Sequence, residues 1–405
     1  MPESRGQEEA ELGIPGAKSG AKIMLFGIKC KKSGRNLHFS ESLGNFAPKN
    51  KPFRMIKITR NASLLPYNTF GMDVRTAMLI EYETETELDE VLNMADVRQL
   101  MHDEQRQGKL PFWHIGSGSN LLFTADYPGV VLHCTARGIA MRDASESEEE
   151  CLIDVKAGTL WDDVCAYCAE QELYGPENLS LIPGETGAAA VQNIGAYGVE
   201  IKDLVLQVKC WSISDRTPQC FTVDRMHYGY RDSIMKHEEW KRNYIVTEVT
   251  LKVSRKPRLR LDYAGLRAAL GDTPTVTAQL VRDTVISIRE GKLPDPRKVG
   301  NAGSFFKNPV VDNQKFEQLL AEYPTMPHYK VDDSHTKIPA GWMIEQCGWK
   351  GRSLGRAGVY ERQSLVLVNR GGAAPDEIVR LSDAVIDDVE HKFGIRIEPE
   401  VNFIR

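Results

Sequence analysis

The sequence has no long run of apolar residues. No stretch approaches the roughly 18–20 apolar residues that a membrane-spanning helix needs, and the short apolar run Ile23–Ile28 follows an acid-rich segment, unlike a secretory signal. Charge of one sign is also scarce, because the net charge is only -5 over 405 residues. A chain with this charge has little attraction for nucleic acid. We therefore expect a cytoplasmic protein that neither inserts into membranes nor binds nucleic acid.

Paired cysteine motifs are nearly absent. The eight cysteines are scattered, which favours free thiols in a reducing compartment. Cys165 and Cys168 form a CxxC, but they share helical spacing with Leu160 and Val164, which favours core packing over redox or metal use. No second CxxC or histidine pair stands at zinc spacing, so we expect no metal site.

Length and composition indicate two or three domains of an ordinary globular protein. Hydrophobic residues make up 41% of the chain and charged residues 26%. Residues 1–54 lack sustained periodicity and are rich in Gly, Ser, Lys and Glu, which predicts a disordered extension. Met55 opens a stretch that is typical of a protein start. Either the extension is real or the true start lies at this methionine.

The remaining chain alternates between strand and helix patterns. Thr84 and Glu87 form a capping-box pattern before an amphipathic helix that reaches Ala95, and Thr277 can cap a second helix. Further helices are predicted around Cys165 and at 316–320, 341–347 and 376–392. Strands are predicted at Ala77–Tyr82, Phe112–Ile115, Gly129–Cys134, Cys151–Lys156, Leu204–Ile213, Tyr244–Val253, Leu365–Asn369 and Arg396–Ile404. The Pro- and Gly-rich segment Lys292–Gly303 interrupts the alternation and predicts a domain boundary.

The first glycine loop is HIGSGSNLLF, at His114–Phe123. Its small residues let backbone N–H groups approach a ligand closely, and such a turn can bind a pyrophosphate. The hydroxyls of two serines and an asparagine amide add donors. The candidate binding residues are therefore Gly116, Ser117, Gly118, Ser119 and Asn120. The alternative is a tight turn without a ligand. The loop is not a GxGxxG fingerprint, because the third glycine is missing.

The second glycine loop spans Leu181–Ile201 and is almost free of charge. An uncharged loop of this length suggests backbone packed against a flat or extended ligand, with Gln192 and Asn193 as hydrogen-bonding groups. The alternative is a buried structural loop. Glu185 interrupts the uncharged run, and the sequence indicates no role for it. Two such loops point to a large dinucleotide held by the main chain.

A single serine, Ser304, stands in the stretch GNAGSFFKNP (Gly300–Pro309). A nucleophile, a proton donor and a turn residue are all possible. A nucleophilic serine needs a histidine that accepts its proton, and no histidine stands in a recognisable elbow. Phe305 and Phe306 could exclude water from a pocket or simply pack in a core.

Seven motifs in this order carry a resemblance to a known family. They are SLLPYNTFG (63–71), GSGSNLLF, IPGETGAAAVQNIGAYG, GYRDS (229–233), KLPDP (292–296), GNAGSFFKNP and EPEVNF (398–403). From about Ile56 to Arg405 the chain resembles UDP-N-acetylenolpyruvoylglucosamine reductases, in the form with an extra loop around Tyr263. The resemblance implies an α+β fold with a two-part FAD-binding domain of the vanillyl-alcohol oxidase (PCMH) type and an α/β substrate-binding domain. The implied domains are 55–124 and 125–291 for FAD, 292–397 for the substrate and a C-terminal strand at 398–405.

The family's chemistry sets expectations for the site. The resemblance implies that NADPH reduces bound FAD, that UDP-N-acetylglucosamine enolpyruvate is then reduced to UDP-N-acetylmuramate for peptidoglycan, and that a monomer does this. It implies that Ser304 protonates the enol, that Arg231 stabilises the enolate and that Glu400 assists. Tyr263, Lys292 and Asn308 match residues that bind the nucleotide-sugar substrate. The matching FAD residues, beyond the first loop, are Pro183, Gly184, Gly187, Gln192, Asn193, Gly195, Ala196, Tyr197, Gly198 and Arg289.

Two departures and two rival hypotheses remain. The first loop lacks a glycine that is common in the family, and Asn402 stands where the family often has an arginine. One rival is another FAD oxidoreductase of the same fold with a different substrate. The other is a non-catalytic protein that binds nucleotide sugars. The presence of Ser304, Arg231 and Glu400 together argues against the second rival.

Overall fold

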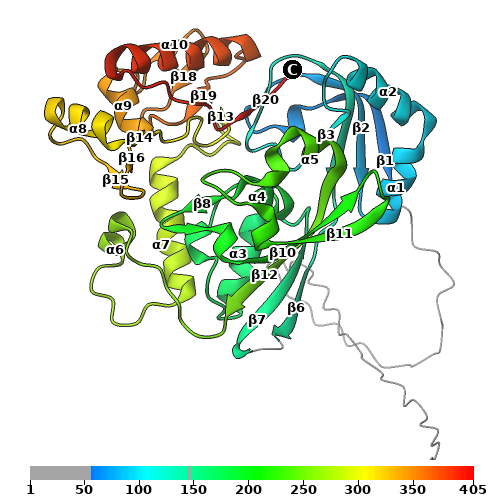
Figure 1. The fold of residues 1–405 in the computed structure, drawn as a ribbon, viewed down its shortest axis with the longest axis horizontal. Coiled ribbons are helices and arrows are strands. Elements are labelled where there is room, and N and C mark those ends of the chain that lie inside the picture. Colours follow the sequence, from blue (N-terminus) through cyan, green and yellow to red (C-terminus); the bar gives the residue numbers. More distant parts are fainter. Residues whose placement is uncertain (1–55, 145–146) are drawn as a thin grey trace, which may run out of the picture. The chain divides into compact units, whose positions relative to one another are not determined.

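A sheet of four strands forms the first part of the fold (Figure 1). The computed structural model describes residues 56–144 and 147–405, so the predicted extension at 1–54 lies outside the described residues. The strand order is β1-β2-β5-β3, with β1 antiparallel to β2 and the other pairs parallel. The strands are β1 Lys57–Ser63, β2 Arg75–Tyr82, β3 Phe112–Ile115 and β5 Tyr127–Cys134. Helices α1 (Glu85–Asn93) and α2 (Ala95–Arg106) join β2 to β3.

The central strands β2 and β5 of the first sheet are buried on both faces. Along β2, Met78 and Ile80 belong to one hydrophobic cluster and Leu79 to another, as expected from side chains that alternate between faces. Val130 and Val131 of β5 divide in the same way. Burial on both faces explains why these strands appear in the sequence as nearly continuous apolar runs.

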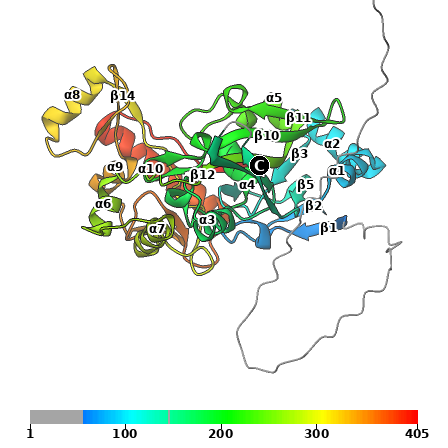
Figure 2. The same cartoon turned by 90° about the horizontal axis from the view of Figure 1, so that it is seen from below.

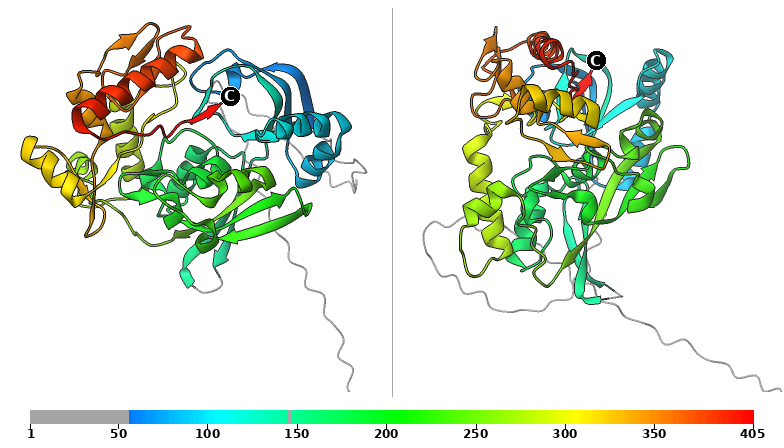
Figure 3. Two further views of the ribbon diagram at one scale, coloured as in Figure 1. Left: turned by 45° about the horizontal axis from the view of Figure 1, so that its top comes forward. Right: turned by 60° about the vertical axis from the view of Figure 1, so that its left-hand side comes forward.

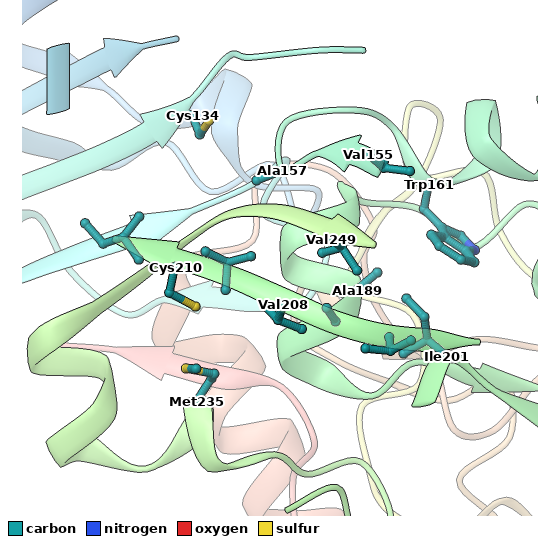
Figure 4. Close-up of a cluster of buried hydrophobic side chains, with 14 of the residues drawn as sticks. Cys134, Val155, Ala157, Trp161, Ala189, Ile201, Val208, Cys210, Met235 and Val249 are labelled. Atoms are coloured by element: carbon teal, nitrogen blue, oxygen red, sulfur yellow. The ribbon is translucent and has the colours of Figure 1, made fainter. Parts of the chain in front are cut away.

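A second sheet of five antiparallel strands follows, in the order β11-β10-β12-β7-β6. Its strands are β6 Ile139–Ala144, β7 Ser147–Lys156, β10 Val205–Ser212, β11 Thr217–Thr222 and β12 Tyr244–Ser254. Helices α3 (Trp161–Glu170), α4 (Thr186–Gln192) and α5 (Glu238–Asn243) and the hairpin β8–β9 (Gly195–Ala196, Val199–Glu200) belong to this region. Figure 4 shows Ala189 of α4 among Val208 of β10 and Val249 of β12.

The C-terminal region contains two smaller sheets. One has the order β13-β19-β18-β17 and the other β14-β16-β15. Helix α10 contacts β18 and β19 (Figure 1), and α7 contacts α3 and α6 (Figure 2). The elements are α6 Ala264–Leu270, α7 Ala278–Lys292, α8 Asn313–Glu322, α9 Ala340–Gln346, α10 Pro375–Phe393, β13 Gly300–Asn301, β14 Val310–Asp312, β15 Tyr329–Lys330, β16 His335–Lys337, β17 Ser353–Leu354, β18 Ala357–Val359 and β19 Leu367–Asn369.

The chain end returns to the first part of the fold. Strand β20 (Asn402–Ile404) pairs in parallel with β4 (Leu121–Phe123), directly after the first glycine loop (Figure 3). The predicted strand Arg396–Ile404 is therefore too long, because residues 396–401 contribute only a bridge between Pro399 and Phe306. This pairing brings the EPEVNF motif beside the glycine loop.

Most predicted elements are confirmed, including β3 with both of its ends and the capping box of Thr84 and Glu87. The first predicted helix is confirmed as α1, but it ends at Asn93 and does not reach Ala95, because Met94 adopts an extended conformation (φ -62°, ψ 136°) and separates α1 from α2. The partition into domains stays a prediction. The first sheet includes β5 and so extends beyond the predicted boundary at residue 124. Among the described residues, no helix is long and apolar enough to cross a membrane.

Candidate active site

The two glycine loops meet at one cavity of about 330 Å³. A volume of this size falls within the range of small-molecule sites. The three predicted catalytic side chains, Ser304, Arg231 and Glu400, also line it. Of the predicted cofactor residues, the lining includes Gly116, Ser117, Gly118, Ser119, Asn120, Pro183, Gly184, Gly187, Gln192, Gly195 and Arg289.

The first loop connects β3 to β4 with its backbone closely packed on one side. Gly118 has a φ of +66°, and a Cβ atom there would lie 2.0 Å from the carbonyl oxygen of Tyr67. Only glycine fits this position without a shift of the backbone. In the described part of the chain, the backbone N–H groups of Ser117, Gly118 and Ser119 donate to no protein acceptor. They are available to an anionic ligand.

The serine hydroxyls of this loop are already used by the protein. Ser117 donates from Oγ to Glu185 Oε1 at 3.0 Å, and Ser119 donates from Oγ to the Pro183 carbonyl at 3.0 Å. A hydroxyl has one proton to donate. The expectation that both hydroxyls donate to the ligand therefore does not agree with this geometry. Instead, they tie the first loop to the second.

The second loop presents glycine backbone and one amide to the cavity. A Cβ atom at Gly187 would lie 2.9 Å from the Ala157 Cβ, so helix α4 packs closely here. Gln192 lines the cavity, and its buried Oε1 has no hydrogen-bond partner. Asn193 differs, because its amide donates to Glu200 Oε2 (3.0 Å) and to the Gly229 carbonyl (2.7 Å). Asn193 and the predicted residues Ala196, Tyr197 and Gly198 do not line the cavity.

Arg289 reaches the cavity from the last turns of α7. Burial lowers the pKa of its guanidinium, while nearby Tyr197 and Asp162 oppose that change. Its Nε atom has no hydrogen-bond partner in the structure. A buried cation with an unused donor is expensive unless an acceptor approaches it. Arg289 and Gln192 thus leave two polar atoms that a ligand can satisfy.

Arg231 and Glu400 form an ion pair at the cavity. Arg231 Nε lies 3.1 Å from Glu400 Oε1, and Nη2 donates to the Gly195 carbonyl at 2.6 Å. An arginine without a catalytic role could form an ion pair with its neighbour Asp232. Instead, Asp232 Oδ2 lies 3.5 Å from His237 Nε2. The backbone of Arg231 has a φ of +56°, which non-glycine residues rarely adopt.

Lys236 belongs to the same cluster and was missed from the sequence. Its Nζ donates to the Arg231 carbonyl at 2.8 Å, and it lines the cavity. Burial lowers the pKa of Lys236. Burial also raises the pKa of Glu400, against the opposing effects of Arg231, Lys236 and Lys307. The only sequence signal for Lys236 is its position five residues after Arg231 of the GYRDS motif.

Ser304 is exposed at the cavity beside the Glu400 segment. The backbone on its C-terminal side is fixed, because Phe305 donates to the Leu365 carbonyl and accepts from the Glu400 N–H, each at 2.7 Å. Phe305 and Phe306 are fully buried in the core, where Phe305 contacts the ring of Phe70. The core-packing alternative for the two phenylalanines is therefore the one the structure supports.

The three predicted substrate-binding residues lie outside this cavity. Tyr263 is 45% exposed and contacts the ring of Tyr197 edge-on at 5.3 Å. Lys292 is exposed at the end of α7. Asn308 accepts from the Ala340 N–H at 2.9 Å and donates to the Tyr230 hydroxyl at 3.4 Å. The departure residue Asn402 lines the cavity and donates to the Asn120 carbonyl at 3.3 Å.

The cysteines pack as side chains of the core or lie free in the described part of the chain. Its cysteines are all free, and Cys165 and Cys168 are fully buried, as their helical spacing predicted. Within the same residues, no group of three or more His, Cys, Asp or Glu side chains could hold a metal ion.

The cavity fits FAD. The free N–H groups of the first loop suit a pyrophosphate, and glycines of both loops line the cavity without side chains of their own. Unpartnered atoms of Gln192 and Arg289 would be satisfied by such a ligand.

Comparison with known proteins identifies the family. Residues 77–215 match an FAD binding domain, and residues 295–404 match the C-terminal domain of UDP-N-acetylenolpyruvoylglucosamine reductase. Reductases of this name are 50% identical in Bacteroides fragilis and 43% identical in Porphyromonas gingivalis, covering 84% and 86% of this chain and 98% and 99% of those proteins.

A solved structure supports the fold. The UDP-N-acetylenolpyruvylglucosamine reductase of Thermus caldophilus has a TM-score of 0.57 at 21% identity, covering 87% of this chain and all of that one. The predicted α+β class with an FAD-binding domain of the vanillyl-alcohol oxidase type is confirmed. The chain belongs to the UDP-N-acetylenolpyruvoylglucosamine reductase family of FAD-dependent oxidoreductases.

Proposed function

We propose that this protein reduces UDP-N-acetylglucosamine enolpyruvate to UDP-N-acetylmuramate, with NADPH as the reductant, in peptidoglycan precursor synthesis. The observation that carries the proposal is the convergence of Ser304, Arg231 and Glu400 on the cavity formed by the two glycine loops. The family and its FAD-binding domain support the reaction class. We further propose that the enzyme acts as a monomer in the cytoplasm.

The cofactor would be held mainly by the main chain. The N–H groups of Ser117, Gly118 and Ser119 would bind the pyrophosphate, with Gln192 and Arg289 as side-chain ligands. Bound there, FAD would accept a hydride from NADPH and supply it to the enolpyruvyl double bond. The protein's own residues then have two tasks, to stabilise negative charge on the substrate and to deliver a proton to carbon.

Arg231 is our candidate for the first task. Two backbone carbonyls and Glu400 hold its guanidinium, and Lys236 holds its backbone. A fixed guanidinium can stabilise the carboxylate of the enolate as charge develops there, without reorganising during the step. Because burial weakens screening by water, this stabilisation is larger than at a surface.

Ser304 is our candidate for the second task. This exposed residue lines the same cavity, and we infer that it donates the proton to the enol carbon. The backbone hydrogen bond from Glu400 to Phe305 keeps the serine next to the Arg231–Glu400 pair. Glu400 would support charge and proton transfer at this point. Tyr263, Lys292 and Asn308 would bind the diphosphate and neighbouring groups beyond the cavity.

Anaerobic half-reactions of Ser304→Ala test the proposal. We expect the bound flavin to bleach with NADPH as in the wild type, while reoxidation by the enolpyruvyl substrate slows by about a hundredfold or more, in the range for a lost general acid. Ser214→Ala is the matched control, because Ser214 is an exposed serine in the turn between β10 and β11 and does not line the cavity. Normal reoxidation in Ser304→Ala would rule out Ser304 as the proton donor. A colourless protein that binds no added FAD would favour the non-catalytic alternative.

A further inference from the structure

Glu185 is a buried carboxylate in the middle of an otherwise uncharged loop. Its side chain lies against the first glycine loop, since a Cβ atom at Gly116 would be 3.0 Å from Glu185 Oε2. Glu185 is 5% exposed. A carboxylate at this place should repel a diphosphate held by the same loop, so its presence needs a structural reason.

The reason lies in the partners of one oxygen atom. Glu185 Oε1 accepts from Ser117 Oγ at 3.0 Å and contacts His133 Nε2 at 3.1 Å. A carboxylate only accepts, so Nε2 carries the proton of this hydrogen bond. Ser117 follows strand β3 and His133 lies on strand β5, both in the first sheet, whereas Glu185 directly precedes helix α4 in the second glycine loop. The contact therefore joins the first sheet and its glycine loop to the second glycine loop.

A second carboxylate extends this network toward the surface. His133 Nδ1 is buried, has no hydrogen-bond partner and lies 3.8 Å from Glu81 Oε1. Glu81 in turn accepts from Lys57 at 2.6 Å and from the Tyr67 hydroxyl at 2.9 Å. Burial alone would raise the pKa of Glu81, but these hydrogen bonds lower it. The imidazole thus lies between two carboxylates, and its N–H offsets the charge of Glu185 beside the glycine loop.

We propose that Glu185 and His133 are positioning residues for FAD: Glu185 fixes the loop Gly116–Ser119 through the Ser117 hydroxyl, and His133 fixes Glu185. The inference rests on FAD binding in this cavity and is independent of the reductant and of the proton donor. The role belongs to the acceptor atom Oε1, because both partners use that atom. A glutamine can supply the same acceptor without the charge.

The test measures the dissociation constant of FAD on the holoenzyme, from flavin fluorescence after dilution, without NADPH or substrate. We expect Glu185→Ala to weaken FAD binding about tenfold, since it leaves buried donors unpaired. Glu185→Gln should stay within about threefold of the wild type because it keeps the acceptor. Glu177→Ala is the matched control, since Glu177 is equally buried (2% exposed) and lies outside the cavity.

A double-mutant cycle separates positioning from general destabilisation. If Ser117 acts through Glu185, Ser117→Ala should add no further loss of affinity in the Glu185→Ala background. Wild-type FAD affinity in Glu185→Ala, equal losses in Glu185→Gln and Glu185→Ala, or additive effects of the Ser117 and Glu185 changes would each overturn the proposal. A wild-type protein that binds no FAD would instead refute the cofactor site itself.

Discussion

Replacement of Arg231 by methionine is the most informative single perturbation. Methionine keeps much of the side-chain volume but removes three interactions, with Glu400 Oε1 at 3.1 Å and with the carbonyls of Gly195 (2.6 Å) and Asn193 (3.4 Å). The change leaves the carboxylate of Glu400 without its ion-pair partner. It also removes the cation that the proposed mechanism assigns to the enolate.

Two magnitudes follow from this geometry. Removing one partner of a fully buried ion pair costs roughly 3–5 kcal/mol. The side chains of Arg231 and Glu400 remain 20% and 15% exposed, so we expect a smaller loss of about 2 kcal/mol in the free energy of unfolding. Loss of a fixed group that stabilises transition-state charge typically costs about 100- to 1,000-fold in rate. That loss should fall on reduction of the substrate, because NADPH oxidation needs no enolate.

Anaerobic stopped-flow measurements separate the two half-reactions. We expect Arg231→Met to bleach with NADPH at a rate within about threefold of the wild type, and to reoxidise with substrate at least a hundredfold more slowly. Arg216→Met is the control, because Arg216 lies in the turn between β10 and β11, pairs with Asp89 of α1 and does not line the cavity. Unchanged reoxidation in Arg231→Met would refute the assignment of Arg231 to the enolate. Equal losses in both half-reactions would show that the change disrupts the cofactor cavity instead.

Three further predictions concern the loops, the domain core and pH. Gly118→Ala should abolish tight FAD binding, because its Cβ would lie 2.0 Å from the Tyr67 carbonyl oxygen; equilibrium titration with FAD checks this. Asp162→Ala should lower the free energy of unfolding by about 2–3 kcal/mol, since it leaves Arg282 without the carboxylate it contacts at 2.6 Å; urea unfolding measures it. Because the pKa of Glu400 is raised above its ordinary value of 4.5, its ionisation costs stability as pH rises through the folded pKa. The melting temperature of Glu400→Gln relative to that of the wild type should therefore shift upward as pH rises above about 4.5, because the glutamine does not ionise; thermal melts over a pH series measure this shift.

Local sequence signals predicted the elements that depend on near neighbours. The capping box of Thr84 and Glu87 involves residues three apart, and both of its hydrogen bonds are present. Thr277 likewise caps α7 through the Leu280 N–H. The strand Phe112–Ile115 ends where the glycine loop begins, so its boundary is a local property as well. Such features need no information from the rest of the chain.

The errors arise where a distant partner decides the structure. Strand β20 is three residues long because its partner β4 offers only Leu121–Phe123, about 280 positions away in the sequence. No pattern within Arg396–Ile404 contains that limit. Asn193 was predicted to face the cofactor, but Glu200 and the Gly229 carbonyl take its amide. The partners of Glu185, Ser117 and His133, precede it by 68 and 52 positions, so no local pattern indicated its proposed role.

The cluster around Glu400 shows how these distant contacts produce a functional group. Burial raises the pKa of this carboxyl, while Arg231, Lys236 and Lys307 lower it, and burial has the larger effect. An acid whose pKa is moved toward the working pH can both hold and release a proton. Its backbone N–H meanwhile donates to Phe305, the neighbour of Ser304. The fold thus places the Glu400 carboxyl, with its raised pKa, against Arg231, which we propose stabilises the negative charge of the substrate. The same segment lies beside Ser304, which we propose donates the proton. We expect Glu400 to act on both residues, so Glu400→Gln should slow reoxidation by substrate while leaving reduction by NADPH close to the wild-type rate.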